Sequence, residues 1–169
     1  MTAPTSAPMQ PRAAELIAAL QLVPHPEGGY FREVYRSGAR VQPVDARSER
    51  ASLTTIYFLL TSTDVSRWHR VGSDETWHLY EGDPLELFIA DGTFEEVTRH
   101  VLGPVAGDSR PVHVVPAHQW QAARSLGAYS LAGCTVAPGF EFADFEMLRD
   151  RPDADETMRT RHTEFASLI

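Results

Sequence analysis

The sequence has no lysine and only one cysteine, and all 15 of its permanent cations are arginines. Without a lysine amine, the chain cannot form the Schiff base of pyridoxal enzymes and aldolases, nor supply the lysine of a P-loop. Cys134 has no second cysteine to pair with, which argues against a disulfide-stapled secreted scaffold. The first eleven residues also lack the basic start and apolar run of a signal peptide, so we expect a cytoplasmic protein.

Long apolar runs and an excess of positive charge are missing as well. No stretch of about eighteen apolar residues occurs, so we expect no membrane-spanning helix and no membrane partner. The formal net charge of −8 disfavours a surface that neutralises phosphates, so nucleic acid is not expected as a partner. The composition, 43% hydrophobic and 22% charged over 169 residues, is that of one compact globular domain.

The two ends of the chain differ from its middle. Residues 1–11 predict a flexible tail, residues 12–150 a single domain, and residues 151–169 a C-terminal extension with a helix over 157–167. A short opening helix is expected over 13–20, because Leu16, Ile17 and Leu20 share one side at helical spacing. After residue 140 the alternation of strands is lost, and the aromatic residues there predict a packed helical turn around Phe142, Phe145 and Met147.

Between these ends the pattern predicts strand after strand. The segments are short and rich in branched and aromatic residues. We expect strands at 30–36, 54–60, 67–71, 75–80, 85–90, 93–101, 112–115, 119–124 and 129–136. Asp91 and Gly92 predict a type I′ hairpin turn, because both tolerate positive φ. Such a series is typical of a sandwich, jelly roll or barrel, so the predicted fold class is all-β.

The segment 66–84 resembles the first cupin motif, which has two histidines one residue apart, then a glutamate, and a glycine seven positions after the glutamate. Glu75 and Gly82 meet the last requirement, and His69 takes the place of the first histidine. Val71 takes the place of the second and supplies no lone pair. Residues two apart on a strand share a face, so His69 and Val71 point into a barrel together.

The segment 116–121 resembles the second cupin motif, which has a proline, a glycine and a histidine. Pro116 is kept, while His118 stands at the glycine position and Gln121 at the histidine position. The metal set that the motifs imply is therefore His69, Glu75 and Gln121, with Gln121 a weak oxygen donor. This set does not predict tight transition-metal binding and leaves a divalent metal open as a cofactor.

Several motifs in order resemble the fifth cupin family, long classed as a domain of unknown function. They stand at residues 24–30, 68–69, 73–78, 82–84 and 137–142, and the resemblance runs from about residue 16 to 147. It implies a cupin double-stranded β-helix, that is, a jelly-roll barrel with short terminal helices. It also implies a homodimer, and a similarity to sugar-nucleotide epimerases. His118 departs from the family pattern, in which a glycine is more usual.

Each candidate site residue has a functional and a structural interpretation. His69 is a metal ligand or general base, or else a hydrogen-bonded core histidine. His78 has the opposite strand parity to Glu75, so it faces away unless a bulge intervenes. His25 and Glu27 lie on a Pro/Gly loop, either as functional residues or as ordinary surface. Further candidates for contact with a substrate are Trp68, Trp77, Trp120, Gln121 and Tyr129, with the tryptophans equally explained as core or interface aromatics.

Three functions follow from these residues. The first is an isomerase or epimerase that binds a small polar metabolite such as a sugar derivative, with His69 as base, Glu75 beside it, and Tyr57, Tyr80 or Tyr129 as acid. The second is a metal-dependent isomerase or oxygenase, and the third a binding module without turnover. Arg67, Arg70 and Arg124 are anion ligands or members of solvated ion pairs. In each case we expect His69, Glu75 and Gln121 to converge on the floor of one pocket.

Overall fold

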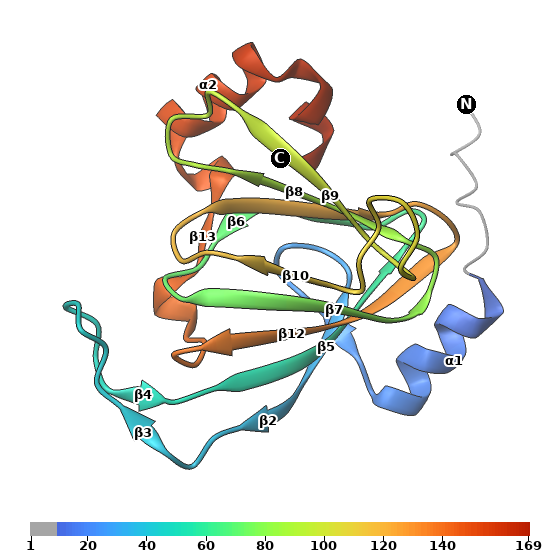
Figure 1. Ribbon diagram of the computed structural model, residues 1–169, viewed down its shortest axis with the longest axis horizontal. Coiled ribbons are helices and arrows are strands. Elements are labelled where there is room, and N and C mark those ends of the chain that lie inside the picture. Colours follow the sequence, from blue (N-terminus) through green and yellow to red (C-terminus); the bar gives the residue numbers. More distant parts are fainter. Residues whose placement is uncertain (1–9) are drawn as a thin grey trace, which may run out of the picture.

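The computed structural model describes residues 10–169 and consists mainly of two antiparallel sheets that face each other (Figure 1). One sheet has the order β1 (Val23–Pro24), β2 (Tyr30–Arg36), β5 (Thr54–Thr61), β12 (Tyr129–Ala137), β7 (Asp74–Gly82) and β10 (Val112–Val115). The other has the order β13 (Glu146–Met147), β6 (Val65–Arg70), β11 (Trp120–Ser125), β8 (Leu85–Ala90) and β9 (Val97–Leu102). Strands β3 (Arg40–Val41) and β4 (Arg50–Ala51) pair to form a small hairpin. The predicted all-β fold is confirmed.

The inner faces of the two sheets form the main core. Alternate residues of each strand point inward, as the two-residue period of a strand requires. Phe58 and Trp77 from the larger sheet pack against Leu85 and Leu87 from the smaller one. This core fills one part of the space between the sheets and leaves the end near β6 and the start of β7 for polar side chains.

Helices cover parts of the outer faces. Helix α1 (Pro11–Leu20) packs through Ala13 and Leu16 on the six-stranded sheet, on the side away from the C-terminal helices (Figure 1). Helix α2 (Pro152–Arg161) and the 3-10 segment η3 (Thr163–Leu168) cover the five-stranded sheet, where Met158 and Leu168 are buried. Of the tail expected over residues 1–11, residues 1–9 lie outside the described residues, and Pro11 already belongs to α1. Among residues 10–169, no helix is long and apolar enough to cross a membrane.

The segment after β12 combines short elements where one helical turn was predicted. The 3-10 turn η1 (Phe142–Asp144) is followed by β13 and then by a second 3-10 turn, η2 (Leu148–Asp150). Met147 lies in β13 and pairs with His69 of β6. The strand forms because β6 offers a free edge at this point, which adds backbone hydrogen bonds that a helical turn could not make.

The connection between β8 and β9 also differs from the prediction, which placed a two-residue type I′ turn at Asp91 and Gly92. The connection spans residues 91–96, and β9 begins only at Val97. The Asp91 carboxylate accepts hydrogen bonds from the backbone N–H of Thr93 at 2.8 Å and of Phe94 at 3.2 Å, and Phe94 has a φ of 52°. The buried Phe94 ring packs near Trp120 on the outer face, and this burial favours the longer turn.

Candidate functional site

A cavity of about 40 Å³ lies between the two sheets at the end near β6. This volume exceeds the roughly 10–15 Å³ that one water needs, so the cavity has room for a few water molecules or a small ligand group. Aromatic and aliphatic side chains form most of its wall, and a polar cluster forms the rest. The lining residues of the polar cluster are His25, Glu27, His69 and Glu75.

The loop between β1 and β2 brings Glu27 into the cavity. Gly28 and Gly29 have φ values of 116° and 67°, which favour glycine. A Cβ on Gly28 would lie 2.1 Å from the carbonyl oxygen of Val65, so this loop packs directly on β6. The backbone N–H of Arg67 donates to the Glu27 carbonyl at 2.9 Å. The carboxyl group of Glu27 is consequently buried beside His69, which the Pro/Gly pattern of the loop did not reveal by itself.

Glu27 sits between two imidazoles. Its Oε1 accepts a hydrogen bond from Ser66 Oγ at 2.8 Å, and its Oε2 lies 3.3 Å from both His25 Nδ1 and His69 Nε2. His69 Nδ1 lies 2.7 Å from the Arg67 carbonyl and must donate to it, so Nε2 of the neutral ring carries a lone pair. His25 Nδ1 accepts a hydrogen bond from the Glu27 backbone N–H at 3.3 Å, so this nitrogen also carries a lone pair. Two lone pairs facing Oε2 favour a proton on Glu27.

Burial shifts the pKa of every titratable group in this cluster toward its neutral form. Burial, with a smaller contribution from neighbouring His69, lowers the pKa of His25 to about 4. Burial raises the pKa of Glu27 to about 8 despite the hydrogen bond from Ser66. Burial also lowers the pKa of His69 and raises that of Glu75. Near pH 7 the cavity therefore presents neutral imidazoles next to the protonated carboxyl group of Glu27.

Gln121 supports Glu75 from behind and does not line the cavity. Its Nε2 donates to Glu75 Oε2 at 2.6 Å, and its Oε1 accepts from Trp77 Nε1 at 2.9 Å. Both ends of the amide are thus engaged, and the amide orientation is set by its partners. In the β11–β6 pairing Gln121 lies opposite His69, so the predicted trio does gather at one end of the barrel. Within residues 10–169, however, the carboxyl group within 4 Å of the His69 ring nitrogens is that of Glu27 and not that of Glu75.

Five other candidates lie outside the cavity, which differs from the expectation that they contact a substrate. Tyr80 lies on the outer face of the six-stranded sheet, 6.2 Å from Tyr57 and 6.4 Å from His78 between ring centroids. The Tyr129 hydroxyl donates to Glu81 at 2.9 Å. Strand alternation accounts for Tyr80 and His78, because inward-facing Glu75 and Trp77 precede them at the opposite parity. The remaining two, Trp68 and Trp120, are buried on the outer face of the smaller sheet beneath the C-terminal helices.

The polar cluster was also tested as a site for a divalent metal ion. His25 Nδ1 and His69 Nε2 both face Glu27, Val71 fills the position of a second histidine, and the amide of Gln121 is engaged behind Glu75. In the described part of the chain, no group of three or more His, Cys, Asp or Glu side chains has a geometry that could hold a metal. These side chains do not fit a resident divalent ion.

Comparisons with known proteins agree with this architecture. A family model described as "Cupin superfamily (DUF985)" matches residues 14–148. A hypothetical protein from Leishmania major is 32% identical, with a TM-score of 0.79 over 93% of this chain and 96% of that one. A protein from Shewanella oneidensis is also 32% identical, with a TM-score of 0.78 over 92% and 93%. A dTDP sugar isomerase from Desulfovibrio desulfuricans shares the fold at 13% identity, with a TM-score of 0.50 over 74% and 85%. The comparison with curated proteins gave no match.

Proposed function

This chain belongs to the cupin superfamily, in the family described as DUF985, and from this we propose that it is an isomerase-type or epimerase-type enzyme acting on a small metabolite. The observation that carries the proposal is the gathering of buried His69, Glu27 and Glu75 in one cavity, with His69 Nε2 3.3 Å from Glu27 Oε2. Buried environments that shift the pKa values of neighbouring acid and base groups are typical of acid–base sites. The likeness in fold to a dTDP sugar isomerase favours a sugar derivative among the possible substrates.

In this proposal His69 is the base. Its Nε2 lies 3.3 Å from Glu27 Oε2, at the long end for a hydrogen bond, so a ligand that enters the cavity has only this weak contact to replace before it reaches the lone pair. The Arg67 carbonyl holds Nδ1–H at 2.7 Å and stabilises the imidazolium that forms when Nε2 takes a proton. Glu75, whose pKa is raised by burial and whose carboxyl group is oriented by Gln121, returns a proton to the neighbouring substrate atom. Glu27 orients the imidazole of His69.

The test is exchange of substrate hydrogen with deuterium in heavy water, measured by NMR on a panel of sugar derivatives and small hydroxy and keto acids. We expect His69→Gln to slow exchange on the accepted compound at least about a hundredfold, because a positioned general base contributes 10²–10⁴ in rate. His100→Gln is the matched control, since His100 does not line the cavity. Binding of a panel compound without exchange by the wild type would identify a binding module and overturn the proposal.

We also propose that the protein is a homodimer joined through the outer face of the six-stranded sheet. Four side chains on this face, Tyr35, Tyr80, Val112 and Val114, are 43–54% exposed, and a second copy would cover them. We expect sedimentation velocity at micromolar concentration to show a dimer, and Val114→Asp to give a folded monomer because it buries a charge in the interface. Val105→Asp, on an exposed connection elsewhere, should leave the dimer intact. A wild type that sediments only as a monomer contradicts this assembly.

A further inference from the structure

A second hollow, of about 210 Å³, lies beside the cavity and is not used by the proton transfer described above. Val71 lines both spaces. Phe145 lines the cavity, while its chain neighbours Asp144 and Glu146 line the hollow. The two spaces therefore share a wall. The other residues that line the hollow are Arg47, Arg70, Gly72 and His118.

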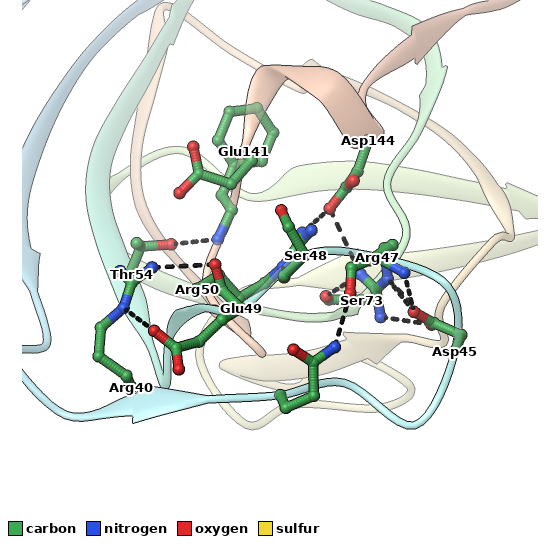
Figure 2. Close-up of polar contacts among 12 residues, drawn as sticks. Arg40, Asp45, Arg47, Ser48, Glu49, Arg50, Thr54, Ser73, Glu141 and Asp144 are labelled. Carbon is green, nitrogen blue, oxygen red and sulfur yellow. Dashed lines mark hydrogen bonds and ion pairs between the residues drawn. The ribbon is translucent and has the colours of Figure 1, made fainter.

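Arg47 is held rigidly at one side of this hollow. Its guanidinium contacts Asp45 at 2.9 Å, Ser73 Oγ at 2.8 Å and Asp144 at 3.4 Å (Figure 2). It also lies across Gly72, where an added Cβ would be 2.9 Å from Nη1 and 3.4 Å from Cζ. The φ of Gly72 is not in the left-handed region, so a side chain there would act through space, by displacing Arg47, and not through backbone conformation. Gly72 therefore makes room for Arg47.

Arg70 faces the same hollow and is also fixed. Its guanidinium carbon lies 4.7 Å from the centroid of the Trp120 ring, and its Nε and Nη2 donate to Glu146 at 3.2 and 2.9 Å. Its Nη1 has no hydrogen-bond partner within residues 10–169. His118, with a φ of 67° and its N–H bonded to the Val71 carbonyl, places an exposed imidazole at the rim. The hollow thus offers the uncommitted Nη1 of Arg70 and the imidazole of His118.

The carboxylates in this region are outnumbered by arginines. Asp144 forms ion pairs with buried Arg50 and with Arg47, and Glu146 pairs with Arg70 and with Arg151 at 3.5 Å. Two arginines and two carboxylates line the hollow itself, and with the flanking Arg50, Arg151 and Asp45 the count becomes four arginines to three carboxylates. This local excess of positive charge stands out in a chain whose formal net charge is −8.

We propose that this hollow is a subsite for an anionic group, carboxylate or phosphate, at one end of the metabolite whose reacting part enters the cavity. This proposal rests on the proposed function in one respect: the anionic group in the hollow and the reacting part in the cavity belong to one ligand. A fixed guanidinium group with a free Nη1, as in Arg70, suits either anion, because both accept charge-assisted hydrogen bonds from it. The substrate class is then a small acid or a phosphorylated compound with an uncharged reacting end.

The test uses inorganic phosphate and acetate as probes at constant ionic strength, with binding followed by NMR at the backbone amides of Gly72 and His118. We expect saturable binding that becomes about tenfold weaker or worse in Gly72→Ala, which displaces Arg47 without changing the charge, and in Arg70→Gln. Arg40→Gln, which removes an exposed arginine outside the hollow, should bind as the wild type does. Stronger binding of phosphate supports a phosphorylated substrate, and stronger binding of acetate supports a carboxylic acid.

The subsite is overturned if neither anion gives saturable shifts at these amides, or if Gly72→Ala and Arg70→Gln both keep wild-type affinity. His69→Gln separates this result from the proposed function, because it should lose hydrogen exchange while still binding the anion. Loss of anion binding in His69→Gln would show that the anion enters the cavity and would overturn the subsite.

Discussion

Replacing Glu27 by glutamine should stabilise the protein at alkaline pH, by on the order of 4 kcal/mol at pH 8. The pKa of Glu27 is raised from 4.5 to about 8 in the folded protein, so above pH 4.5 the unfolded chain loses this proton while the folded chain keeps it. Wild-type stability therefore falls between about pH 4.5 and 8. Glutamine has no charge to bury and can still accept the hydrogen bond from Ser66.

Urea unfolding at a series of pH values measures this difference. The two proteins should be alike near pH 4.5 and diverge as the pH rises toward 8. Glu141→Gln, which alters a partly exposed carboxylate, is the control and should follow the wild type. The lowered pKa of His25 acts in the opposite sense: stability is lost as the pH falls from 6.5 toward 4, and this acid limb should persist in Glu27→Gln. An equal gain at every pH would contradict the assignment of Glu27 as a buried neutral acid.

Replacing Arg50 by alanine should destabilise the protein by about 3 kcal/mol. The Arg50 side chain is only 2% exposed and pairs with Asp144, which is 11% exposed (Figure 2). Its loss leaves the buried carboxylate of Asp144 with Arg47 at 3.4 Å and cuts the main tie between the β3–β4 hairpin and η1. Chemical denaturation of the variant measures the cost.

An exposed ion pair of the same hairpin provides the matched control. Arg40 and Glu49 lie 3.3 Å apart with side chains 50% and 60% exposed, and surface pairs of this kind contribute about 0–1 kcal/mol. Arg40→Ala should therefore change stability by less than about 1 kcal/mol. Similar costs for Arg40→Ala and Arg50→Ala would show that burial of the second pair does not set its strength.

The strands were predictable where a clear pattern met a clear turn. The bounds of β2, β8 and β10 agree with the sequence prediction, because branched and aromatic residues alternate there between glycine and proline signals. The β8–β9 connection was not predictable from Asp91 and Gly92 alone. Its shape depends on Phe94 reaching a core on the outer face, which involves residues far away in the sequence.

The site residues likewise divide into those that the sequence predicted and those that it did not. The motif spacing correctly placed His69 and Glu75 in one cavity, since both come from neighbouring segments of the same motif. His25 and Glu27 could only be marked as loop residues, because their position depends on how closely the Gly28 backbone approaches β6 some forty residues later. The amide of Gln121 was expected to face a ligand, but the indole of Trp77 on the opposite sheet binds its oxygen.

The cover that α2 and η3 form over the outer face of the five-stranded sheet has a consequence for folding during synthesis. Trp68, Phe88 and Trp120 lie under residues of α2 and η3, which leave the ribosome after every strand of the two sheets. During synthesis these large rings are therefore uncovered on a sheet that is otherwise ready to form. A nascent chain in this state exposes a sticky apolar surface, so its yield in the cell should depend on chaperones that shield it until translation passes residue 168.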